Sequence, residues 1–128
     1  MAQEFTVSLQ AIIDECKLEV IHTPQDPAKI FISNIDVNRP GLQLAGFYEY
    51  FDKGRIQIIG KAETAYLEQC GAEIRAQRIK KFFSEQPAAV VVSRGMDIMP
   101  EMRDLAKELD IPLLRSEERH LRQSSLHI

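Results

Sequence analysis

The sequence predicts one α/β domain, built on a mostly parallel sheet that is flanked by helices. From Ile56 to the end of the chain, apolar runs of strand length alternate with segments of helical periodicity, and this order predicts right-handed crossovers between parallel strands. The clearest run is Ala88–Val92, a valine-rich stretch after Pro87 that is typical of a strand buried on both faces. A length of 128 residues with 45% apolar residues fits a single domain over positions 1–128.

The N-terminal part is predicted to contain a helix, a short strand and a longer extended segment. Thr6 can cap the helix, and Leu18–Ile21 follows it as a strand. The two prolines of Thr23–Pro27 indicate a loop, and Ala28–Val37 is expected to be extended, with a bulge or break at Ser33-Asn34. One face of the helix should pack into the core through residues at i, i+3, i+4 and i+7 spacing: Leu9, Ile12, Ile13 and Cys16.

The second half is predicted to supply the central strands and their crossover helices. Gly71 should interrupt one helical stretch, Pro100 should open another, and Pro112 places its strand at the sheet edge or at a strand start. The predicted strands are Arg55–Gly60, Ala88–Val92 and Ile111–Leu114; the predicted helices are a short one at Gly41–Ala45, one from Lys61, Ala72–Phe83, Pro100–Leu109 and one from Ser116.

Two polar corners are the candidate binding surface. In the first, a strand-to-helix turn contains Pro40, whose φ is fixed, and Gly41, which can take φ values that other residues avoid; in the second, a Ser-Arg-Gly turn follows the valine-rich strand. Ligands of parallel sheets collect at the carboxyl ends of strands, where both corners should lie, and arginine suits carboxylates and phosphates. The candidate binding residues are Asp36, Asn38, Arg39, Gly41, Arg55, Ser93, Arg94 and Gly95. An intramolecular ion pair from Asp36 to Arg39 or Arg94 is an equally good interpretation.

The aromatic segment Phe47–Phe51 has three interpretations. It is expected to form a lid over the core more readily than a ligand platform. A protein-protein surface is the remaining hypothesis, and homo-oligomerisation is left open.

Composition and motifs argue against several function classes. With a formal net charge of −3 we expect no nucleic acid partner, because the basic cluster Arg75–Lys81 spreads around a helix among glutamates. Neither a targeting segment nor an apolar run of about 18 residues is present, which predicts a cytoplasmic protein without membrane contact. Cys16 and Cys70 have no metal-type spacing and are expected to be reduced thiols. We expect no metal and no cofactor.

Catalytic motifs are also missing. Gly54–Ala62 superficially suggests a phosphate-binding loop, but the spacing between its glycines is one residue too long and Ala62 replaces the magnesium-binding hydroxyl residue. No nucleophile elbow, zinc-protease helix or kinase catalytic loop occurs. The sequence therefore predicts no catalytic residues.

Three segments resemble a known family in their order and spacing. Asp36–Phe47, Arg55–Glu63 and Pro87–Gly95 resemble the N-terminal domain of HPr kinase/phosphorylase, and Ile111–Leu114 is similar to its closing strand. The resemblance implies a bifunctional bacterial enzyme that phosphorylates a serine of the sugar-transport phosphocarrier HPr and removes the phosphate by phosphorolysis, and so controls carbohydrate use through carbon catabolite repression.

In that family the P-loop and the catalytic residues lie in a C-terminal kinase domain, which these 128 residues do not contain. The resemblance therefore implies a non-catalytic regulatory or assembly domain, whose partners are that kinase domain and, as further candidates, HPr or a small phosphorylated metabolite. The family domain is similar in fold to the N-terminal domain of Mur ligases. This leaves an alternative, a stand-alone module that binds a nucleotide or sugar phosphate at Asp36, Arg39 and Arg94.

Overall fold

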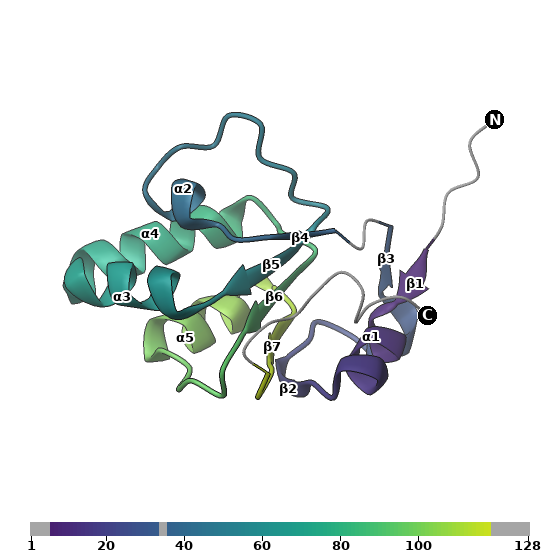
Figure 1. Cartoon of the computed structure of the whole chain (residues 1–128). Helices are drawn as coiled ribbons and strands as arrows, with labels where there is room; N and C mark the ends of the chain where they lie inside the picture. Colours follow the sequence, from purple (N-terminus) through teal and green to yellow (C-terminus); the bar gives the residue numbers. More distant parts are fainter. Residues whose placement is uncertain (1–5, 34–35, 119–128) are drawn as a thin grey trace.

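A five-stranded sheet runs through the molecule with helices on both of its faces (Figure 1), and an apolar core lies against each face. The computed structural model describes residues 6–33 and 36–118. Its strands are β1 (Val7–Ser8), β2 (Glu19–His22), β3 (Phe31–Ile32), β4 (Val37–Asn38), β5 (Ile56–Ile59), β6 (Ala89–Val92) and β7 (Leu113–Arg115). Its helices are α1 (Leu9–Cys16), the 3-10 turn η1 (Pro27–Lys29), α2 (Gly41–Leu44), α3 (Lys61–Gln69), α4 (Ala72–Ser84) and α5 (Pro100–Leu109).

The main sheet has the order β2-β7-β6-β5-β4 and is mostly parallel, as the sequence predicts. Strands β4, β5, β6 and β7 run in one direction, and β2 pairs with β7 in the opposite direction. Strands β1 and β3 form a separate two-stranded antiparallel sheet. The α/β class and the single parallel-sheet domain are thus confirmed.

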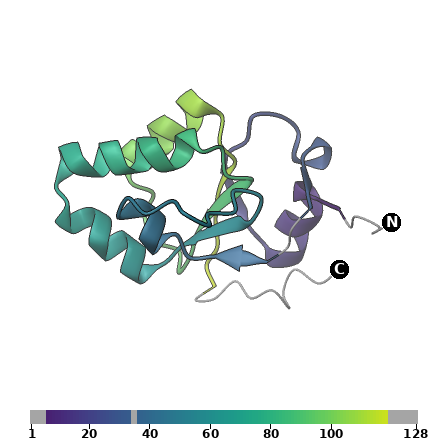
Figure 2. The same ribbon diagram turned by 90° about the horizontal axis from the view of Figure 1, so that it is seen from above.

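Each face of the main sheet carries its own core. Helix α1 and the small sheet cover one face, and α2 to α5 cover the other (Figures 1 and 2). Strand β6 shows the alternation clearly, since Ala89 and Val91 point to the α1 side while Val90 and Val92 point to the helical side. All four residues are buried, which explains the unbroken apolar run.

Local chemistry sets the ends of the helices. Helix α1 is capped by Ser8, whose hydroxyl accepts the Ala11 N–H at 3.1 Å, so the prediction of Thr6 as the cap is wrong by two residues. Gly71, with φ of 80°, separates α3 from α4 as expected. Pro100 occupies the first turn of α5 as predicted.

The predicted extended segment Ala28–Val37 is wrong as one element. Its start is taken up by η1, where the Asp26 carboxylate accepts the Ala28 N–H at 3.0 Å. Strands β3 and β4 then join different sheets, on either side of residues 34–35, which lie outside the described part. The break predicted at Ser33-Asn34 falls between β3 and β4. β3 belongs to the small sheet, and β4 is an edge strand of the large one.

Two strands are displaced from their predicted bounds, and one helix is not found where it should begin. The strand predicted at Leu18–Ile21 is β2, one residue later, because the Leu18 N–H donates to Ile13 at the end of α1. Pro112 has no N–H to donate, and β7 begins directly after it, which agrees with the strand-start alternative; β7 lies inside the sheet, so the edge alternative is wrong. Residues 116–118 are not helical, and the remainder of the helix predicted from Ser116 lies outside the described residues.

Candidate functional site

Strands β4, β5, β6 and β7 all end on the same side of the sheet. The residues that follow them there are Arg39, Gly60, Ser93 and Ser116. The register pairs Asn38 with Gln57 and Ile59 with Val92, so the two predicted corners both lie at these carboxyl ends. Asp36 does not. It precedes β4, level with Arg55 at the opposite end of the strands, because β4 is only two residues long. The expectation that Asp36 lies beside Arg39 and Arg94 is therefore wrong.

The first corner is closed by a carboxylate of the protein itself. Oε1 of Glu63 accepts from Nη2 and Nε of Arg39 at 2.9 and 3.2 Å, and from the N–H of Gly60 at 2.7 Å. Gly60 is the N-cap residue of α3 and has no side chain, so only one of the two hydrogen bonds of a capping box forms, the one from the Gly60 N–H to the Glu63 side chain. A Cβ at Gly60 would collide with the Arg39 guanidinium. The N-terminus of α3, a natural anion site, is thus already occupied.

Sequence reasoning missed Glu63. The sequence predicts an ion pair from Asp36 to Arg39 or Arg94, whereas the partner of Arg39 is Glu63 on α3, whose side chain is only 6% exposed. The pattern Gly60-x-x-Glu63 ahead of a helix is the signal that could have found it.

The second corner is held in place by backbone hydrogen bonds. Ser93 is buried, and its N–H donates to Ile59 at 3.0 Å. Arg94 and Gly95 both have a φ near 60°, and their N–H groups donate to Glu118 and Ser116 at 2.8 Å each. The corner therefore anchors the segment that leaves β7, and the Arg94 side chain remains exposed beside it.

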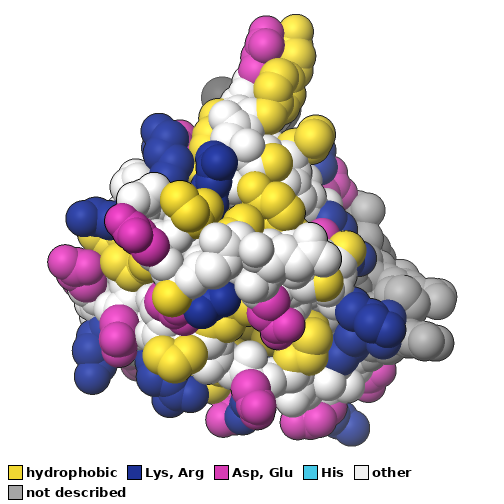
Figure 3. Space-filling model, turned by 90° about the vertical axis from the view of Figure 1, so that its left-hand side faces the viewer, with side chains coloured by type: hydrophobic (Ala, Val, Ile, Leu, Met, Phe, Trp, Pro, Cys, Tyr) yellow, Lys and Arg dark blue, Asp and Glu magenta, His cyan; other side chains and the backbone are white. Residues whose placement is uncertain are grey.

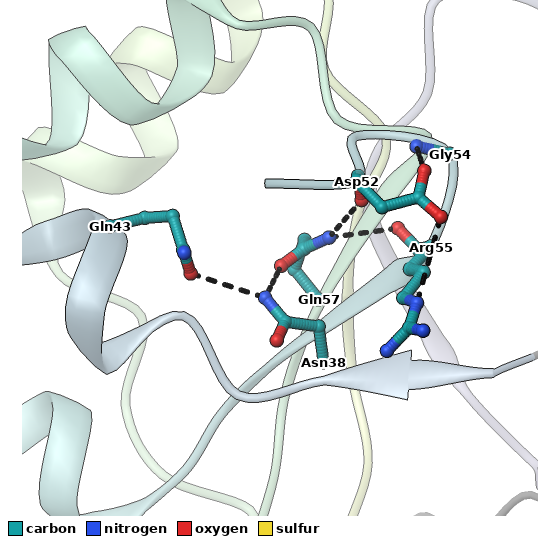
Figure 4. A network of polar contacts seen from close by, with 6 residues as sticks. All are labelled: Asn38, Gln43, Asp52, Gly54, Arg55 and Gln57. Carbon is teal, nitrogen blue, oxygen red and sulfur yellow. Dashed lines mark hydrogen bonds and ion pairs between the residues drawn. The ribbon is translucent and has the colours of Figure 1, made fainter. Parts of the chain in front are cut away.

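A polar pocket lies between β4, α2 and the turn before β5 (Figure 4). Gln57, fully buried on β5, donates Nε2 to the backbone carbonyls of Arg55 at 3.1 Å and Asp52 at 3.4 Å. Nδ2 of Asn38 donates to Oε1 of Gln57 at 2.7 Å and to Oε1 of Gln43 at 3.2 Å. The pocket measures about 110 Å³ and is lined by Asn38, Gln43, Tyr50, Phe51, Asp52 and Arg55.

Charge in the pocket is nearly balanced. Nε of Arg55 lies 3.6 Å from Oδ2 of Asp52, too far for a hydrogen bond, and this buried nitrogen has no hydrogen-bond partner among the described residues. Oδ1 of Asp52 accepts the Gly54 N–H at 3.0 Å. Sequence reasoning named Asn38 and Arg55 but missed Gln43 and Gln57, although a glutamine inside the apolar run Ile56–Ile59 is itself a signal.

The aromatic segment is divided between core and solvent. Tyr48 and Phe51 pack on the helical core, with their rings edge to face at 5.8 Å, which confirms the lid for these two residues. Burial, followed by the charge of Glu85, raises the pKa of Tyr48 to about 12. Phe47 and Tyr50 are exposed, and 92% of Tyr50 faces solvent.

The remaining surface carries mixed charge. On the helical face that Figure 3 shows, basic and acidic side chains are interspersed. Arg75 pairs with Glu101 at 2.8 Å and Lys81 with Glu85 at 3.4 Å, as expected of a solvated face. Within residues 6–33 and 36–118, no three His, Cys, Asp or Glu side chains are grouped to hold a metal ion. None of the described helices combines the length and apolar character that crossing a bilayer needs.

Comparison with known proteins gives a consistent result. Residues 7–126 match the family described as HPr Serine kinase N terminus. The HPr kinase/phosphorylase of Clostridium perfringens strain SM101 is 43% identical over 111 residues, which cover 87% of this chain and 36% of the relative. That of Caldanaerobacter subterraneus subsp. tengcongensis is 45% identical over 112 residues, covering 88% and 36%. The chain thus spans little more than a third of these relatives.

A similar fold occurs among solved structures. The CBS and DRTGG domains of the regulatory region of a Clostridium perfringens pyrophosphatase, complexed with diadenosine tetraphosphate, align with a TM-score of 0.58 at 21% identity. The alignment covers 87% of this chain and 41% of that one.

Proposed function

The chain belongs to the HPr serine kinase N-terminus family, and on this basis we propose that it is a non-catalytic regulatory or assembly domain of an HPr kinase/phosphorylase that controls bacterial carbohydrate use. Its principal partner is then the C-terminal kinase domain of the parent enzyme, with HPr or a small phosphorylated metabolite as further candidates. The parent would act in the cytoplasm.

One observation carries this proposal. The match to relatives named for kinase and phosphorylase activity extends over 36% of their length. Within this part, the hydrogen bonds at the two corners are made to other groups of the same fold. Glu63 holds Arg39 and Gly60, while residues 116–118 hold the second corner.

Phosphate binding at Asp36, Arg39 and Arg94 has less support. Asp36 lies at the other end of the strands from the two arginines, and Arg39 already shares a hydrogen-bonded carboxylate with Gly60. A phosphate at α3 would have to displace Glu63, a buried group, from two partners.

The test measures phosphate transfer to HPr. The purified chain is incubated with HPr and either ATP or pyrophosphate, with the Clostridium perfringens enzyme as a positive control. We expect no phosphoserine from the chain alone, and any transfer would refute the non-catalytic assignment.

A chimera then tests the regulatory role. In the Clostridium perfringens enzyme, the 111 matched residues are replaced by this chain in one variant and deleted in another. We expect the chimera to retain the oligomeric mass and HPr phosphorylation rate of the parent, and the deletion to change at least one of them. A deletion that leaves both unchanged would contradict a regulatory or assembly role.

A further inference from the structure

We propose that the polar pocket between β4, α2 and the Asp52–Arg55 turn binds a small neutral planar group that presents an N–H donor beside a C=O acceptor, as an amide or a lactam ring does. This inference goes beyond the regulatory role and is independent of it, because it rests on the pocket alone. The pocket's hydrogen-bonding polarity, its charge and its size each support it.

The polarity begins at Gln57, whose orientation is fixed by chemistry. One end of its amide faces the backbone carbonyls of Arg55 and Asp52, and carbonyl oxygens only accept hydrogen bonds. That end must therefore be the nitrogen, and Oε1 must face Asn38. Since the Gln57 side chain is fully buried, it cannot turn to water.

The orientation of Gln57 sets that of the next two amides. Asn38 must offer Nδ2 to Oε1 of Gln57, and the second hydrogen of the same nitrogen is donated to Oε1 of Gln43. This leaves Oδ1 of Asn38 as an acceptor and Nε2 of Gln43 as a donor, both on residues that line the pocket. An amide or lactam edge supplies the matching donor and acceptor.

Charge and size restrict the ligand further. The Arg55 guanidinium lies against Asp52, so the pocket does not offer the uncompensated positive charge that selects phosphate. A volume of about 110 Å³ is below the roughly 300 Å³ of drug-sized ligand pockets, and suits one small ring or one carboxamide.

The experiment is a titration of the ¹⁵N-labelled chain followed by NMR, with two pairs of ligands. Uracil is compared with 1,3-dimethyluracil, which has no N–H, and L-glutamine with L-glutamate, which has no amide. We expect saturable shifts of the Asn38 and Gln43 side-chain amide signals with an affinity of about 1 mM. A response to uracil identifies a lactam ligand, and a response to glutamine alone identifies a carboxamide. Equal responses within both pairs, or no response at about 10 mM, would overturn the proposal.

A variant adds a second criterion. Gln43→Glu keeps the oxygen that accepts from Asn38 and replaces the donor with an acceptor, so it should weaken binding about tenfold or more. Gln77→Glu makes the same change at an exposed position of α4 and should bind like the unmodified chain. Equal weakening by both variants, or undiminished binding by a folded Gln43→Glu, would contradict the assigned polarity. The ligand pairs require no variant, and they decide the matter if Gln43→Glu does not fold.

Discussion

Replacing Glu63 tests whether the carboxylate that closes the first corner stabilises the fold. Its Oε1 accepts from the Gly60 N–H at 2.7 Å and from the Arg39 guanidinium at 2.9 Å, and the side chain is 6% exposed. Glu63→Ala removes both interactions and leaves the N–H of a buried glycine without its partner. Glu63→Gln keeps an oxygen in the same place but removes its charge.

The expected losses follow from burial. A hydrogen bond to a charged group contributes about 1.5 to 3 kcal/mol. The pair with Arg39 adds less than about 1 kcal/mol, because 51% of the arginine side chain is exposed and it can return to water. We therefore expect Glu63→Ala to lower the free energy of unfolding by about 2.5 kcal/mol, and Glu63→Gln by about 1 kcal/mol.

Urea and thermal unfolding measure these losses. At about 4 °C per kcal/mol for a domain of this size, Glu63→Ala should lower Tm by about 10 °C, with the urea dependence unchanged. Glu68→Ala, at an exposed position of the same helix, is the matched control and should change stability by less than about 0.5 kcal/mol. The reasoning is refuted if Glu63→Ala is no less stable than this control, or if the Ala and Gln variants lose equally.

Three further predictions concern other parts of the fold. Gln57→Leu should lower the free energy of unfolding in urea by about 1.5 kcal/mol, because it removes the nearer acceptor of Nδ2 of Asn38 and the side-chain donor to the Arg55 and Asp52 carbonyls; unchanged stability would show that these buried hydrogen bonds contribute nothing net. Tyr50 has φ of 66° at the third position of the Tyr48–Phe51 turn and is 92% exposed, so Tyr50→Gly should raise stability by about 0.5 kcal/mol, whereas a loss would mean that the exposed ring has a hidden role in the fold. Burial, followed by the charge of Glu15, raises the pKa of the Cys16 thiol to about 11; since the folded state holds this proton more tightly, stability should fall as pH rises from about 9 to about 11, and unfolding of Cys16→Ala over this range should show a smaller fall.

The central elements were predictable because burial and backbone geometry restrict the residue types that can stand there. Strand β6 is buried on both faces and therefore reads as unbroken apolar residues, while Gly71 and Pro100 mark helix boundaries through backbone geometry alone. Strands as short as β3 and β4 show no such pattern of residue types. β3 and β4 are two residues each, and pairing with β1 and β5 decides their sheet, not their own composition.

The site was predicted less completely for a related reason. Arg39 and Asn38 could be named from the turn that carries them, but their partners come from other elements, and the distances that join them to Glu63 and Gln57 are set by packing of the whole sheet. Asp36 was misplaced because the start of a two-residue strand cannot be read from the sequence.

The position of β7 has a consequence for how the chain assembles during synthesis. This strand is the last to leave the ribosome among those described, yet it sits inside the sheet, between β6 and the early strand β2, pairing Glu19 with Arg115. Until Arg115 emerges, the outward edge of β6 has no neighbour and β2 has no strand to join. A nascent chain paused before Leu113 would expose two unpaired strand edges, so closure of the sheet is a late event and the stage at which the polypeptide is most open to aggregation.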